Sequence, residues 1–170
     1  PEVEFKSLKI IYPENREFKF GKTKLRFIGP LFHGIEYSRV GWVFLTIVEY
    51  KGEKLIHSSD LNGPIIEDYA NFLIKENPDY LILDGPMTYM LGYTLNLINF
   101  QRVLKNVEKI IKNVNFKAMI WDHHLPREPK FRERTIMVWE LAKKLGKRLF
   151  TASEFQFKKK PVVERNVLKI

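Results

Sequence analysis

Cysteine is absent from the 170 residues of this sequence. Without a thiol the chain can hold neither a disulfide framework nor a thiolate metal site, and this composition fits an intracellular protein. The sequence also lacks any apolar run approaching the roughly 18 residues of a membrane span, and it shows no basic-then-apolar leader. We therefore expect a cytoplasmic protein that does not bind membranes.

Acidic residues are scarce in the last part of the chain. Residues 126–170 hold 13 Lys+Arg and 5 Asp+Glu, whereas residues 1–125 hold 16 and 15. Almost all of the net charge of +9 therefore lies in the C-terminal segment. Such a basic segment is typical of a surface that attracts an anionic substrate or nucleic acid, although a solvated helix followed by a charged tail has the same composition.

The first third of the chain has the pattern of antiparallel strands. Short segments rich in β-branched and aromatic residues alternate there with glycine-containing turns, at Gly21 and Gly52. The predicted strands are Leu8–Tyr12, Arg16–Phe20, Thr23–Ile28, Val40–Tyr50 and Leu55–Ser58. Apolar residues at every second position, Phe18, Phe20, Leu25 and Phe27, predict one buried face.

From Asp60 onward the pattern changes to alternating helices and strands. Apolar residues at helical spacing predict helices over Ile65–Leu73, Phe100–Val114 and Arg132–Leu145, the last capped by Gly146. Apolar runs at Tyr80–Leu83 and Ala118–Trp121 predict strands buried on both sides, and Thr151–Phe157 is predicted as a last edge strand. Because β–α–β crossovers are right-handed, the strands before, between and after the first two helices should be parallel.

Parallel strands would bring polar residues together at one edge of the sheet. Asp60, Asp84, Asp122, His123 and His124 each follow or end a predicted strand, and ligands bind outside the carboxyl ends of strands in open α/β sheets. Imidazole and carboxylate groups are ligands for zinc, iron or manganese. A carboxylate such as Asp60 has one oxygen for each of two cations. We therefore expect a metal site here, with satisfied loop residues as the alternative.

Several of these residues have a structural alternative. His57 lies inside a strand and is predicted to be a packed core histidine rather than a ligand. Asp84 precedes Gly85 and Pro86, a context that favours a turn-forming acid. Of His123 and His124, strand alternation lets only one face inward, so the other would be exposed or would support the first.

Four motifs in this order resemble the metallo-β-lactamase superfamily, and an archaeal branch of uncharacterised predicted hydrolases in particular. The motifs are Phe32-His33-Gly34, His57-Ser58-Ser59-Asp60, Leu83-Asp84-Gly85-Pro86 and Asp122-His123-His124-Leu125. The resemblance implies that His33 ligates a metal, that Asp60 bridges two metals, and that His123 is the final histidine ligand, with His124 as the alternative. Two zinc ions, or iron or manganese, are implied as cofactors.

The superfamily's defining motif, His-any-His-any-Asp-His, is missing from this sequence. The resemblance therefore implies an α/β fold that corresponds mainly to the second half of the αββα sandwich. Residues 1–170 would form a single domain or the C-terminal half-domain of that fold. The implied partner is the N-terminal half, in the same protein or in a separate chain, with a homo-oligomer as the other option.

The function implied by the resemblance is metal-dependent hydrolysis through a metal-bound hydroxide, with Asp60 and His123 as catalytic residues. An anionic substrate such as a phosphodiester would suit the basic C-terminal segment. The alternative is a non-catalytic nucleic-acid-binding or assembly module that contacts phosphates through basic side chains. Those side chains are Arg127, Lys130, Arg132, Arg134, Lys143, Lys144, Lys147 and Arg148.

Overall fold

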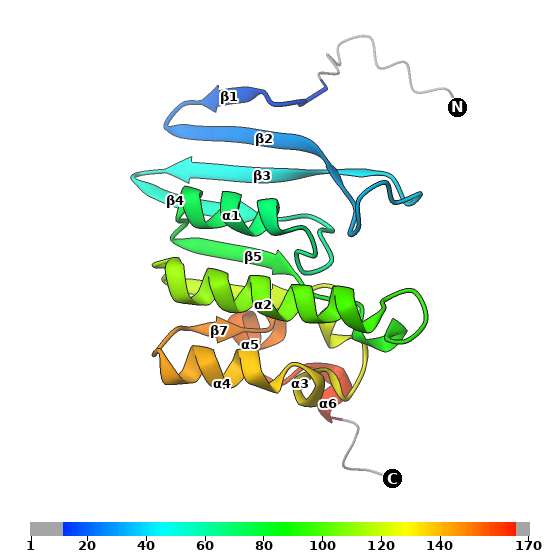
Figure 1. Cartoon of the computed structure of the whole chain (residues 1–170). Helices are drawn as coiled ribbons and strands as arrows, with labels where there is room; N and C mark the ends of the chain where they lie inside the picture. Colours follow the sequence, from blue (N-terminus) through cyan, green and yellow to red (C-terminus); the bar gives the residue numbers. More distant parts are fainter. Residues whose placement is uncertain (1–11, 166–170) are drawn as a thin grey trace, which may run out of the picture.

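The chain folds around one seven-stranded sheet, whose strands follow one another in sequence order from β1 to β7 (Figure 1). This computed structural model describes residues 12–165. Strands β1 to β4 are antiparallel and β4 to β7 are parallel, so the predicted change of pattern is confirmed. The strands are β1 (Glu17–Phe20), β2 (Thr23–Phe32), β3 (Trp42–Tyr50), β4 (Glu53–His57), β5 (Tyr80–Asp84), β6 (Ala118–Asp122) and β7 (Leu149–Phe150).

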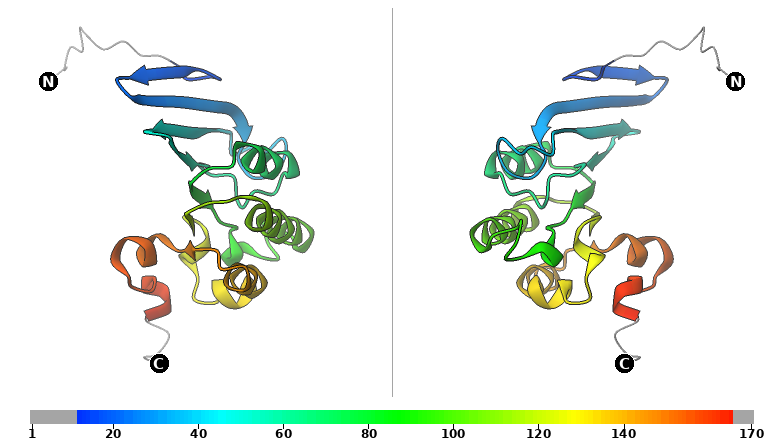
Figure 2. Two further views of the ribbon diagram at one scale, coloured as in Figure 1. Left: turned by 90° about the vertical axis from the view of Figure 1, so that its left-hand side faces the viewer. Right: turned by 90° about the vertical axis from the view of Figure 1, so that its right-hand side faces the viewer.

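Helices α1, α2 and α4 cover one face of the sheet, and each connects two neighbouring parallel strands (Figure 2). On the opposite side the described residues place only α5 and α6, beside the β7 end of the sheet (Figure 2). The helices are α1 (Glu67–Glu76), α2 (Leu97–Asn113), α3 (Phe131–Arg134), α4 (Ile136–Lys144), α5 (Ala152–Phe157) and α6 (Val162–Arg165), with single 3-10 turns η1 (Thr88–Met90) and η2 (Leu125–Arg127). Among residues 12–165, none of these helices has the length and apolar character needed to cross a membrane.

The core lies between the sheet and helices α1, α2 and α4. One residue from each central strand points to this side, and cross-strand pairing places the four in a row: Ile47, Ile56, Leu81 and Met119. All four are fully buried. Burying an aliphatic side chain of this size contributes about 1.5–3 kcal/mol, so this row fixes which face of each strand turns inward.

The other face of the sheet is apolar but only half-buried. The adjacent row across β2 to β5 is Leu25, Val48, Leu55 and Tyr80, and none of these residues is buried. The predicted burial of both sides of β5 and β6 is therefore not reached within residues 12–165, where no helix lies over this face of β1–β5 and Tyr80, Ile82 and Ile120 are only half-buried. We call this surface, together with Phe27, Thr46, His57, Ile82 and Ile120, the open face.

Two further predictions fail on the same surface. His57 is exposed rather than packed in the core, because its side chain belongs to the open face. Phe20 is 63% exposed and Phe18 is only half-buried, so the alternating apolar residues of β1 and β2 do not form a buried face in this chain. Phe18 and Phe27 do pack edge to face, with ring centroids 5.9 Å apart.

The C-terminal part also differs from the prediction. Thr151–Phe157 is a helix rather than an edge strand, because Thr151 and Glu154 form a reciprocal capping box that starts α5. The helix predicted over Arg132–Leu145 is interrupted at Thr135, which separates α3 from α4. The predicted strand Leu8–Tyr12 lies outside the described residues except for Tyr12.

Candidate metal centre

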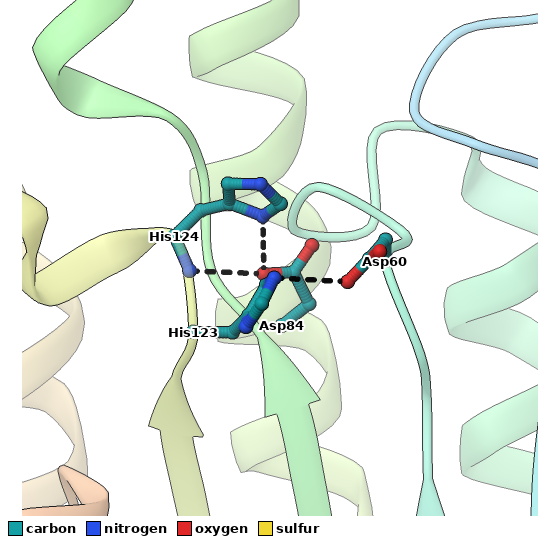
Figure 3. A group of neighbouring side chains, drawn as sticks. All are labelled: Asp60, Asp84, His123 and His124. Carbon is teal, nitrogen blue, oxygen red and sulfur yellow. Dashed lines mark hydrogen bonds and ion pairs between the residues drawn. The ribbon is translucent and has the colours of Figure 1, made fainter. Parts of the chain in front are cut away.

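The loops that follow β4, β5 and β6 meet at the carboxyl edge of the parallel strands (Figure 3). Asp60 follows β4, Asp84 ends β5, and His123 and His124 follow β6. One ligand atom from each of these four residues lies within 4.8 Å of the other three. The parallel arrangement therefore produces the convergence of acids and histidines that the strand order predicts.

Asp60 faces a different histidine with each of its two oxygens. Its Oδ1 lies 3.1 Å from Nε2 of His123, and its Oδ2 lies 3.6 Å from Nε2 of His33. His33 comes from the loop between β2 and β3, so two parts of the chain distant in sequence meet at this one carboxylate. The Asp60 side chain is 39% exposed, which leaves it accessible to a ligand.

These distances fit a pair of bound cations. Two ligand atoms that each lie 2.0–2.2 Å from a tetrahedral zinc ion are about 3.4 Å apart. The Asp60–His123 and Asp60–His33 separations lie on either side of this value. The nitrogen and oxygen donors are also those that zinc, iron and manganese accept. The donor atoms on each side of Asp60 are therefore of the kind and spacing that metal ligation requires.

Asp84 is buried beneath this pair and connects the loops that carry it. Its Oδ2 accepts the backbone N–H of Asn62 at 2.8 Å, and its Oδ1 lies 2.9 Å from Nδ1 of His124 and 3.3 Å from the His124 backbone nitrogen. Its own N–H donates to Oγ of Ser58 at 2.9 Å. The carboxylate thus holds the ends of β4, β5 and β6 in register.

Asn62 extends this network to the third loop. Its side-chain Nδ2 lies 3.4 Å from Nδ1 of His33, so the same residue touches Asp84 through its backbone and His33 through its side chain. Gly34, which follows His33, has a φ of +81°, and a Cβ there would lie 2.8 Å from the Asn62 amide nitrogen. The glycine therefore lets the His33 loop approach the β4 loop closely.

Left-handed backbone conformations are concentrated at the site. Ser59, Asn62 and His123 have φ values of 55°, 51° and 62°. Non-glycine residues in such regions cost on the order of 1–3 kcal/mol each and persist where surrounding contacts hold them. At His123 the holding contact is Asp122, whose Oδ1 accepts the His123 N–H at 2.7 Å and whose Oδ2 accepts the N–H of Ala152 at the start of α5.

A hollow of about 410 Å³ opens beside the cluster. Polar residues of the candidate site form one part of its wall, and Ile82, Ile120 and His57 of the open face form another. The hollow therefore lies between the Asp60–His123 pair and the apolar surface of the sheet. The full lining is His57, Ser59, Asp60, Ile82, Leu83, Asp84, Ile120, Asp122, His123 and Ala152.

Of the residues predicted as metal ligands, Asp60, His123 and His124 belong to the cluster, whereas His33 lies outside it and approaches it at Asp60, 3.6 Å away. Of the two adjacent histidines, His123 is exposed and faces Asp60, whereas His124 is buried and its Nδ1 faces Asp84. The sequence favoured a turn-forming acid at Asp84, so the contacts of its buried carboxylate with Asn62 and His124 were not predicted. The sequence signal that could have identified this carboxylate is its place at the end of a buried strand, directly before Gly85. In the structure, a Cβ at Gly85 would collide with Leu125.

Comparison with known proteins gives relatives that are longer than this chain. It is similar to UPF0282 protein MJ1629 of Methanocaldococcus jannaschii, with 36% identity over 126 residues, which make up 74% of this chain and 42% of that protein. UPF0282 protein MK0213 of Methanopyrus kandleri is 32% identical over 129 residues, 76% of this chain and 43% of that protein. A UPF0282 protein of Metallosphaera sedula is 30% identical over 145 residues, 85% of this chain and 46% of that protein.

The chain therefore spans less than half the length of these curated relatives. No protein-family model matches the sequence.

Proposed function

We propose that this chain carries part of the metal centre of a hydrolase, and that its fold is the second half of a metallo-β-lactamase-like sandwich. The observation that supports the proposal most strongly is the position of Asp60, whose two oxygens face two histidines from separate loops. A carboxylate that only closed a turn would not need this arrangement. A pair of divalent cations would make a coordinated water acidic enough to supply hydroxide near neutral pH.

The chain's own residues have distinct tasks in this proposal. Asp60 would bridge the two cations, and His33 and His123 would each hold one of them. Asp84 supports both sides, because it binds the loop that follows Asp60 and the backbone of His124, next to His123. Such supporting contacts orient ligands, and their loss typically lowers metal affinity about 10- to 100-fold.

The ligand set within residues 12–165 is incomplete for two cations. Asp60 with one histidine gives each cation two protein ligands, whereas catalytic zinc sites have three. We propose that the missing ligands come from a segment carrying His-any-His-any-Asp-His, the N-terminal half of the fold. Its place would be the open face, which is apolar and borders the hollow. The relatives, more than twice as long as the matched part, have room for such a segment.

For the alternative function, a nucleic-acid-binding module, two of the eight basic residues are already paired with carboxylates. Arg132 is paired with Glu154 and Glu164, and Arg134 with Glu128. These carboxylates compensate charges that phosphate binding would use.

The test is metal content and hydrolysis in matched variants. The protein, assembled with its N-terminal half, is loaded with Zn²⁺ or Mn²⁺, and bound metal is measured by elemental analysis beside turnover of a phosphodiester and a carboxylic ester. Asp60→Ala should lose bound metal and all turnover. Asp68→Ala, an exposed acid on α1, should keep both. Full metal retention in Asp60→Ala would remove the bridging role.

A further inference from the structure

Arg127 lies directly beside His123 and is held there by two contacts. Its Nε donates to the backbone oxygen of His123 at 3.2 Å, and its Nη1 donates to the hydroxyl of Tyr89 at 3.3 Å. The guanidinium carbon lies 6.0 Å from the centroid of the Tyr89 ring. Arg127 comes from η2 and Tyr89 from η1, so two loops at the carboxyl edge of the sheet fix the position of this charge.

The third contact of Arg127 conflicts with the one that His123 makes to Asp60. The guanidinium Nη2 lies 3.3 Å from Nε2 of His123, and the same Nε2 lies 3.1 Å from Oδ1 of Asp60. Without a proton Nε2 can accept from Arg127 but faces the Asp60 oxygen unfavourably. With a proton it can donate to Asp60 but faces the arginine N–H unfavourably. A cation ligated by Asp60 and Nε2 resolves this conflict and leaves Nη2 without its partner.

Arg127 also keeps its positive charge uncompensated. Within the part of the chain that the structure describes, no carboxylate lies at ion-pair distance from it, whereas Arg132 and Arg134 each pair with glutamate. Its partners are a carbonyl, a phenol and an imidazole. An arginine anchored through neutral groups remains available to a negatively charged ligand.

We propose that Arg127, oriented by Tyr89, is the subsite that binds the anionic group of the substrate. The inference rests on the proposed hydrolase function and adds the residue that recognises the substrate, an ester with a negatively charged oxygen beside the scissile bond, such as a phosphodiester. A guanidinium has five N–H donors in a planar fork. The contacts to His123 O and Tyr89 use two of them, and Nη2 lies 3.3 Å from Nε2 of His123, the atom that would hold the cation. Such a fork suits two oxygens of a phosphate group.

Inorganic phosphate is the probe for this subsite. The protein, assembled with its N-terminal half, is titrated calorimetrically with phosphate in the Zn²⁺-loaded form and after chelation, and its metal content is measured in parallel. Loss of a charged hydrogen bond in Arg127→Gln should weaken phosphate binding about 10- to 100-fold. Metal content should stay at the wild-type value. Arg127→Lys should recover only part of the affinity, because the fork is lost.

Arg102→Gln is the matched control, because Arg102 is an exposed arginine on α2 whose side chain contacts Asn99. It should bind phosphate like the wild type. Kinetics give a second readout: Arg127→Gln should raise KM for bis(4-nitrophenyl) phosphate and leave KM for the neutral ester 4-nitrophenyl acetate unchanged.

The outcomes separate this inference from the proposed function. Phosphate binding that does not depend on Arg127, or no phosphate binding in either form, overturns the subsite. If the protein binds no metal but binds phosphate through Arg127, the subsite stands and the metal centre falls. If it binds metal and hydrolyses esters while Arg127→Gln binds phosphate normally, the hydrolase stands and the subsite is wrong.

Discussion

Replacing Asp84 by alanine should destabilise the fold even when no metal is bound. The carboxylate is 3% exposed, and its strongest contacts are to the Asn62 N–H at 2.8 Å and to Nδ1 of His124 at 2.9 Å. Alanine would leave both donors buried without an acceptor. At about 1–3 kcal/mol for each unsatisfied donor, the loss is about 2–6 kcal/mol. Against a typical stability of about 5–15 kcal/mol, this is a large fraction.

Asp84→Asn should cost less, because the amide keeps one oxygen acceptor for one of the two donors. We expect a loss of about 1–3 kcal/mol. Urea unfolding with EDTA present measures the effect in the absence of metal, and Trp121, fully buried on β6, provides the fluorescence signal. The midpoints should therefore fall in the order wild type, Asp84→Asn, Asp84→Ala.

Asp60→Ala is the matched control for this experiment. Asp60 is partly exposed, so its removal should change the stability of the metal-free protein by less than about 0.5 kcal/mol. The two variants therefore distinguish an aspartate that supports the fold from one that ligates metal. Asp84→Ala lowers the stability of the fold, whereas Asp60→Ala lowers metal binding alone. An unfolding midpoint for Asp84→Ala equal to that of the wild type would refute the supporting role derived from its contacts.

Three further predictions concern other parts of the chain. His123→Ala should lose metal, whereas His124→Ala should retain a larger share, as elemental analysis of both variants would show; the reverse order would exchange their roles. Hydrogen bonding from Arg26, opposed by burial, lowers the pKa of Glu76 below 4.5. The ion pair of Glu76 therefore stabilises the folded state above that pH, and this stabilisation is lost as the pH falls. Glu76→Gln should therefore be less stable than wild type at neutral pH, with the difference vanishing in acid unfolding titrations. Ile82→Glu, on the open face, should prevent association with the proposed N-terminal half in light scattering, and unchanged association would exclude this face.

The sequence predicted the order of strands and helices because each signal was local. Glycines mark the hairpin turns, with φ values of 58° at Gly21 and 81° at Gly52. Apolar spacing marks α1 and α2, and Gly146, with a φ of 63°, lies just after the end of α4 as predicted. The error at Thr151–Phe157 has a local cause too: the apolar residues indicated a strand, but the Thr151–Glu154 capping box favours a helix.

Other features depended on contacts distant in sequence. An apolar run does not tell what covers each side of a strand, so Tyr80–Leu83 predicted burial on both sides, which residues 12–165 alone do not supply. The convergence of Asp60 and His123 follows from strand order, which the sequence supplies, whereas their proposed roles come from the resemblance. The network of Asp84 depends on three loops meeting, and Arg127 gains its position only when η1 and η2 lie side by side.

The most direct test of the central claim is a crystal structure of the protein, assembled with the proposed N-terminal half of the fold and loaded with Zn²⁺, with data collected at the zinc absorption edge. We predict two anomalous peaks about 3.5–4 Å apart, the spacing of two-metal hydrolytic sites, with Asp60 between them. His33 should ligate one ion and His123 the other. Zinc bound elsewhere, or a single ion that Asp60 does not touch, would contradict the account.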